Sequence, residues 1–156
     1  MPWGSSSPQA RRRLRKDGTR ARGSTEEAGP VTHWRSSGLI LVIDDNSLVC
    51  EVLRHLLEGQ GFTVLTATDG ATGVALFRQH AEEIRAVLLD LIMPGMSGQE
   101  VLRAIHGIRP EARVLLLTGL PEAEARAQVG HTVAGYIQKS FQLAPFLTTL
   151  RQVLGE

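Results

Sequence analysis

Five polar side chains, namely three carboxylates, one hydroxyl and one ammonium group, follow short apolar runs in this sequence. Their positions are Asp44 and Asp45 after LILVI, Asp90 ending AVLLD, Thr118 ending RVLLLT, and Lys139 ending AGYIQK. Adjacent carboxylates at the rim of a buried strand repel each other and resist desolvation. A divalent cation or an ammonium group would offset that cost, and carboxylate oxygens are the ligands that Mg²⁺ prefers.

The apolar runs predict five β-strands. These strands are expected at 39–43, 62–67, 86–90, 113–118 and 134–139. The first, third and fourth are continuous apolar runs without polar alternation, which is typical of parallel strands that are covered by helices on both faces.

Helical segments alternate with the predicted strands. Apolar residues spaced i, i+3, i+4, i+7 and i+8 from Val49 to Leu57 indicate one helix, which Asn46 or Ser47 can cap. Four more helices are expected, around 74–77, after the capping box of Ser97 and Glu100, at 121–129, and from Leu143 to Leu154. Five βα units make an α/β fold, and right-handed crossovers fix its winding. Sites in such sheets form outside the carboxyl ends of the strands, so the five polar side chains should meet at one rim.

The ordered set Asp44-Asp45, Asp90 within LLDLIMPGMSG, Thr118 and Lys139 resembles the receiver domain of two-component response regulators. The resemblance covers about residues 38 to 155. It implies a receiver domain at 38–156, with a doubly wound, flavodoxin-like (βα)5 fold and a five-stranded parallel sheet in the strand order 2-1-3-4-5.

The resemblance also implies the chemistry of the rim. Asp90 would be the phosphorylation site, which takes a phosphoryl group from a histidine kinase or a histidine phosphotransfer protein in a Mg²⁺-dependent reaction. Asp45 and Asp90 would bind the metal directly, the Ile92 backbone carbonyl would be a third contact, and Asp44 would act largely through water. Lys139 would supply a charge and Thr118 a hydroxyl to the phosphoryl group.

A conformational switch is implied as well. Phosphorylation would draw Thr118 inward and bury Tyr136, which would change partner binding at a surface formed by the fourth helix, the fifth strand and the fifth helix. That surface is also a plausible homodimer face. The domain would not be an enzyme in the usual sense, because it would catalyse only its own phosphorylation and slow dephosphorylation.

Three positions depart from the family pattern. Ser140 stands where the family usually has proline, so a cis bond that would help to aim Lys139 is costlier. Ile92 and Leu120 are apolar at positions that flank the path of the hydrolytic water, which predicts slow loss of the phosphoryl group. The alternatives are a Mg²⁺-dependent phosphohydrolase, disfavoured because Ile92 replaces the expected acid/base aspartate, and a phosphorylation-independent interaction module, disfavoured by the intact rim.

The N-terminal segment, 1–37, differs from the rest of the chain. The first 38 residues carry eight Lys or Arg against three acidic residues, with almost no apolar periodicity, so we expect a disordered basic segment or linker. RRRLRK could contact nucleic acid or an acidic membrane, but a solvated linker is favoured because no aromatic residues are interleaved with it. No nucleic-acid binding is expected from the folded domain.

The remaining composition favours a cytoplasmic protein. A single cysteine, Cys50, suits a reducing compartment and is expected to be packed in the core, and no apolar run approaches the length of a membrane span or a secretory signal. Because the chain stops at Glu156 after the last helix, we expect a stand-alone receiver or the C-terminal receiver of a hybrid histidine kinase.

Overall fold

The computed structural model describes residues 37–130, 132–139 and 142–155. Its five strands are β1 (Leu39–Ile43), β2 (Thr63–Ala67), β3 (Ile84–Asp90), β4 (Val114–Thr118) and β5 (Gly135–Gln138). Its five helices are α2 (Ser47–Gly59), α3 (Gly70–Gln79), α4 (Gly98–Ile108), α5 (Glu122–Val129) and α6 (Leu143–Leu154). All strand pairs are parallel and the order is β2-β1-β3-β4-β5, which confirms the predicted (βα)5 fold.

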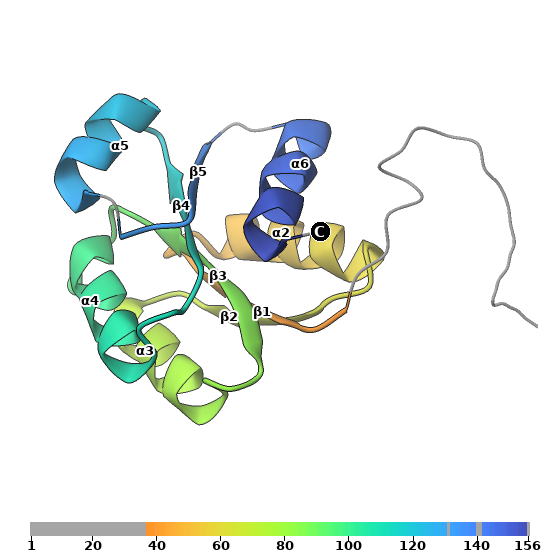
Figure 1. Ribbon diagram of the computed structural model, residues 1–156, viewed down its shortest axis with the longest axis horizontal. Helices are drawn as coiled ribbons and strands as arrows, with labels where there is room; N and C mark the ends of the chain where they lie inside the picture. The colour runs from red at the N-terminus through yellow and green to blue at the C-terminus, as the bar shows by residue number, and fades with distance from the viewer. Residues whose placement is uncertain (1–36, 131, 140–141, 156) are drawn as a thin grey trace, which may run out of the picture. The chain divides into compact units, whose positions relative to one another are not determined.

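The sheet lies between two layers of helices. Figure 1 shows α2 and α6 on one side of the sheet and α3 and α4 on the other. Leu41 and Ile43 of β1 belong to the same buried cluster as Phe77 of α3 and Ile105 of α4. The alternate residues of β1, Ile40 and Val42, are also fully buried, so this strand is covered on both faces as its apolar run predicted.

The strand boundaries differ from the predictions by one or two residues. β3 begins at Ile84 rather than at residue 86, because Ile84 pairs with Leu39 at the start of β1. β5 ends at Gln138, so Lys139 is the first residue beyond the strand rather than its last. In β2, at the edge of the sheet, Thr63 is exposed, the next three residues are partly buried and Ala67 is buried.

Three helices begin with a side chain that caps backbone N–H groups. Asn46 accepts hydrogen bonds from the N–H groups of Leu48 and Val49, so α2 is capped by Asn46 rather than Ser47. Asp69 caps α3, and Ser97 caps α4 in the predicted capping box with Glu100. Because Asn46 caps α2, the carboxylates of Asp44 and Asp45 are not needed for that purpose.

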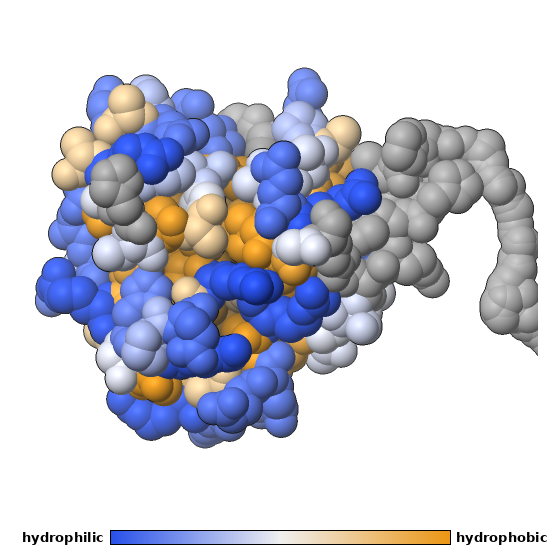
Figure 2. All heavy atoms as spheres, in the orientation of Figure 1, coloured by the Kyte–Doolittle hydropathy of each residue, from blue (hydrophilic) through white to orange (hydrophobic). Residues whose placement is uncertain are grey.

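Parts of the predictions lie outside the described residues. These are Ser140 and all of the basic N-terminal segment except Ser37. Among the described residues, no helix is long and apolar enough to cross a membrane. On the face drawn in Figure 2, hydrophilic side chains cover much of the surface and apolar residues are visible between them.

Gly98 lets the start of α4 approach the end of β3. A Cβ atom at Gly98 would lie 2.6 Å from the carbonyl oxygen of Leu91 and 2.7 Å from that of Asp90. Gly98 also donates its N–H to the Leu91 carbonyl at 3.0 Å. The backbone that follows Asp90 is therefore packed directly against the first turn of α4, and only glycine permits this approach.

We expect Gly98→Ala to lower the free energy of unfolding by about 1–3 kcal/mol, because the added methyl group would displace backbone atoms. Gly107→Ala, in the same helix, is a matched control. A Cβ atom there meets no atom within 4 Å, so better helix propensity should raise stability by about 0.5–1 kcal/mol. Urea unfolding of both variants provides the measurement, and equal effects would contradict the close approach.

Candidate functional site

The ammonium group of Lys139 lies between two buried carboxylates at the carboxyl edge of the sheet. Its Nζ is 3.0 Å from Oδ2 of Asp44 and 3.3 Å from Oδ2 of Asp90. Asp44 is 0% and Asp90 4% exposed, whereas the Lys139 side chain is 31% exposed. Residues from the ends of β1, β3 and β5 thus form one ion-paired cluster.

Burial and like charge shift the protonation of this cluster. Burial, together with the neighbouring charge of Asp44, raises the pKa of Asp90 from 3.8 to about 6, although Lys139 opposes the shift. Burial alone would lower the pKa of Lys139, but the hydrogen bond to Asp44 and the charge of Asp90 outweigh it and raise that pKa. Lys139 is therefore held as a cation while Asp90 resists ionisation.

Asp45 completes a group of three carboxylates. One oxygen each from Asp44, Asp45 and Asp90 lies within 4.8 Å of the other two, and Asp45 is the exposed member. The donors are hard oxygen atoms, and Asp90 ionises with difficulty beside Asp44, so the group is chemically suited to a divalent cation. It is the one group of this kind within 37–130, 132–139 and 142–155.

Ile92, the second residue after Asp90, is largely exposed. The residue is 65% exposed, and its backbone N–H donates to Oδ1 of Asp90 at 3.3 Å. The bond fixes one oxygen of Asp90. The metal contact expected of the Ile92 carbonyl remains a prediction.

Thr118 ends β4 beside Asp90, whereas Tyr136 lies elsewhere. Thr118 is 2% exposed; its hydroxyl accepts the Leu120 N–H at 3.0 Å, and its carbonyl accepts the Lys139 N–H at 2.6 Å. Tyr136 pairs with Leu116 in the sheet, and its hydroxyl donates to the carbonyl of Gly130 at 3.1 Å. The structure therefore places Thr118 at the rim but directs the Tyr136 hydroxyl to the end of α5.

Two groups that support Asp44 were missed by the sequence analysis. The Asn46 N–H donates to Oδ1 of Asp44 at 2.9 Å, which orients the carboxylate. The Cys50 thiol, buried as predicted, lies 3.3 Å from the Asp44 carbonyl oxygen and 3.8 Å from that of Ala67. Burial raises the pKa of the Cys50 thiol, so it remains protonated and can donate. Neither contact has a signal in the spacing of residues.

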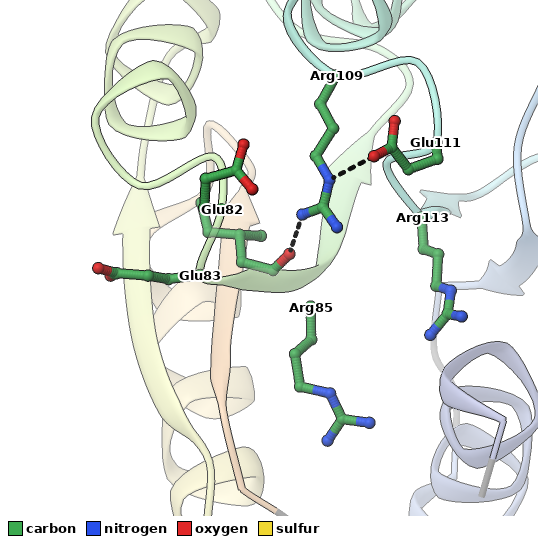
Figure 3. Close-up of a pocket in the computed structure, with 7 residues that line it drawn as sticks. Glu82, Glu83, Arg85, Arg109, Glu111 and Arg113 are labelled. Carbon is green, nitrogen blue, oxygen red and sulfur yellow. Dashed lines mark hydrogen bonds and ion pairs between the residues drawn. The ribbon is translucent and has the colours of Figure 1, made fainter.

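A polar concavity lies at the amino end of the strands, away from the carboxylates, with a volume of about 320 Å³ (Figure 3). Its charged lining residues are Glu82, Glu83, Arg85, Arg109, Glu111 and Arg113. Arg109 donates to the carbonyl oxygens of Ala81 at 2.7 Å and Ile84 at 3.2 Å, and pairs with Glu111. Figure 3 shows the Arg109 guanidinium beside Glu111. Arg109 therefore joins the end of α4 to the turn before β3, which is a structural role.

Comparison with known proteins gives a consistent result. Residues 40–151 match the family model of the response regulator receiver domain. Over 117 residues the chain is 33% identical to the probable transcriptional regulatory protein TcrX of Mycobacterium tuberculosis, an alignment that covers 74% of this chain and 49% of TcrX. The chain therefore spans about half the length of this curated relative.

Solved structures share the fold. A response regulator receiver domain protein from Clostridium thermocellum superposes with a TM-score of 0.70 at 28% identity, covering 76% of this chain and 94% of that one. A chain of the CheX-CheY-BeF3-Mg complex from Borrelia burgdorferi superposes with a TM-score of 0.70 at 26% identity, covering 74% and 88%.

In metal-free protein, we expect Asp90→Asn to raise the free energy of unfolding at pH 8 by about 1–3 kcal/mol. The folded pKa of about 6 exceeds the ordinary 3.8, so ionising Asp90 costs stability above about pH 6. The cost disappears as the pH falls below about 4, where Asp90 is protonated in both states. The gain should therefore shrink between these pH values.

Urea unfolding in EDTA at pH 8 and at about pH 4 provides the measurement. Asp45→Asn, at the exposed carboxylate, is the control and should change stability by less than about 0.5 kcal/mol. A loss of stability in Asp90→Asn at pH 8 would show that the buried charge is not a cost.

Proposed function

The chain belongs to the response regulator receiver family, and from this premise we propose that it is a phosphoacceptor signalling domain that carries a phosphoryl group on Asp90. The observation that carries the proposal is the position of the Lys139 ammonium, which contacts both buried carboxylates. We propose a histidine kinase or a histidine phosphotransfer protein as the donor, and the cytoplasm as the location.

A carboxylate oxygen of Asp90 would be the nucleophile. The bond from this oxygen to phosphorus forms as the bond from phosphorus to the donor nitrogen breaks, leaving an acyl phosphate. The Lys139 ammonium would stabilise negative charge on the Asp90 carboxylate before the reaction and on the phosphoryl oxygens as the new bond forms. Thr118 already accepts the Leu120 N–H, so its own hydroxyl proton is left to donate to a phosphoryl oxygen.

The residues fit a Mg²⁺ ion held by Asp45, Asp90 and the Ile92 carbonyl, with Asp44 acting largely through water. When bound, the ion would neutralise the crowded carboxylates and the phosphoryl oxygens together. The structurally similar chain from Borrelia burgdorferi belongs to a complex that contains Mg, which supports the choice of this metal. Asp44 is fixed for the purpose by the Asn46 N–H.

Phosphorylation would then shift a conformational equilibrium. Thr118 would turn toward the phosphoryl group and Tyr136 would move into the space that it leaves. One hydroxyl bond and one ring burial are each worth about 1–3 kcal/mol, so a population shift is expected rather than an all-or-none change. The affected surface comprises α5, β5 and α6, which is also the proposed homodimer face.

A phosphohydrolase is the second candidate, and Ile92 argues against it. An aspartate two residues after the nucleophile would be needed as acid/base, and this position holds an exposed apolar side chain. Ile92 cannot act as an acid or base, so this position cannot activate water for repeated turnover.

Acetyl phosphate with Mg²⁺ should label the wild-type protein with about one phosphoryl group per chain, because Asp90 is the one proposed nucleophile. Asp90→Asn should take no label, since the amide is not a nucleophile. Intact-mass spectrometry measures the label. Continuous phosphate release would indicate a hydrolase, and no label with either protein would indicate an interaction module.

Loss of the label should be slow, because the apolar side chains of Ile92 and Leu120 cannot orient a water molecule. The double variant Ile92→Asn, Leu120→Glu should lose it faster, on the order of tenfold, by supplying polar groups beside the acyl phosphate. Decay is followed by mass after the donor is removed. Ile108→Asn, at a partly buried position at the far end of α4, is the control for a general effect of polar substitution. Equal decay rates in wild type and the double variant would show that Ile92 and Leu120 do not slow the loss of the phosphoryl group.

A further inference from the structure

Helix α5 is weakly attached to the rest of the domain. Ala125 is its one buried residue, and its N-cap, Pro121, provides no side-chain hydrogen bond. Gln99 of α4 donates to the carbonyl of Gln128 at 2.8 Å, which ties the outer side of the helix. With so little buried surface, individual contacts to α5 should have a measurable effect on its position.

Tyr136 of β5 makes two contacts with α5 and its C-cap. The guanidinium carbon of Arg126 lies 4.8 Å from the centre of the Tyr136 ring, a cation–π distance. The Tyr136 hydroxyl donates to the carbonyl of Gly130, which caps the helix, at 3.1 Å. Arg126 is also paired with Glu122 one turn earlier, which holds the guanidinium in place. The two contacts join the second half of α5 to β5.

Both contacts depend on the present orientation of Tyr136. If the ring turns inward toward Thr118, its face leaves Arg126 and its hydroxyl leaves Gly130. The free energies of both contacts therefore oppose the turn.

We propose that Arg126 and the Gly130 carbonyl form a latch with Tyr136 that holds α5 against β5 in the unphosphorylated state, so that Arg126 sets how readily the domain switches. The proposal rests on the proposed function, because it assigns the latch to the same conformational change. Arg126 is a positioning residue here, since it acts through Tyr136 and does not touch the phosphoryl site.

The chain has a single tyrosine, so 3-fluorotyrosine gives one ¹⁹F resonance that reports on Tyr136 alone. The experiment titrates full-length protein with beryllium fluoride in the presence of Mg²⁺, as a stand-in for the phosphoryl group. A substitution that destabilises the unphosphorylated conformation relative to the activated one makes beryllium fluoride bind more tightly by a corresponding factor. Arg126→Ala should lower the beryllium fluoride concentration at the midpoint of the titration by about two- to fivefold. This is the range that the free energy of an exposed cation–π contact provides.

Two further variants separate the parts of the latch. Tyr136→Phe keeps the ring under Arg126 but loses the bond to Gly130, and Arg103→Ala removes an exposed arginine from α4 as the matched control. Amide hydrogen exchange of the metal-free proteins should show faster exchange in α5 for Arg126→Ala and Tyr136→Phe, by about two- to fivefold, and no change for Arg103→Ala. This measurement needs no phosphorylation.

The outcomes are distinguishable. An unchanged midpoint and unchanged exchange in Arg126→Ala, with normal labelling of wild type, would overturn the latch and leave the proposed function standing. Absence of both labelling and beryllium fluoride binding in wild type would overturn the proposed function, and the switching role of the latch with it. Faster α5 exchange in Arg103→Ala equal to that in Arg126→Ala would show a general charge effect instead of a latch.

Discussion

The contact of one ammonium group with two buried carboxylates is the interaction on which the site depends. Asp44 and Asp90 end adjacent strands, so their charges are brought together by the same hydrogen bonds that build the sheet. Lys139 follows β5, and β4 separates that strand from β3, so its long side chain must extend across the end of β4. The ion pair therefore depends on how the strand order places these three strand ends.

We expect the arrangement to cost stability, because burial and the charge of Asp44 raise the pKa of Asp90. The raised pKa of Asp90 shows that one lysine does not fully offset the burial of two acids. A partner that brings positive charge, or that converts the Asp90 carboxylate into a different group, would reduce the electrostatic repulsion between Asp44 and Asp90. Binding and chemistry at the rim are thus linked to the stability of the domain itself.

Much of the fold and the rim could be predicted from the sequence, for a physical reason. Strands buried on both faces are continuous apolar runs, so β1, β3 and β4 are recognised directly, and the residue that ends each run is placed at the rim. The groups that hold those residues were not recognisable. The Cys50 thiol acts through its contact with the Asp44 carbonyl, and Arg126 meets Tyr136 only after α5 and β5 pack, so neither produces a periodic pattern. Strand ends were shifted where pairing partners decided them, as at Ile84.

The two arginine contacts at the amino end of the sheet have a consequence for how the domain can be joined to other polypeptides. Arg85 donates to the Ser37 carbonyl at 2.7 Å, and Arg113 donates to the Leu154 carbonyl at 3.3 Å. Ser37 and Leu154 are thus both held by hydrogen bonds at the end of the sheet opposite the carboxylates. A fusion partner or a surface linker joined at Ser37 or Leu154 would be attached at the end of the sheet opposite Asp90. The domain could then be immobilised, or inserted into another protein, with the carboxylate cluster left accessible.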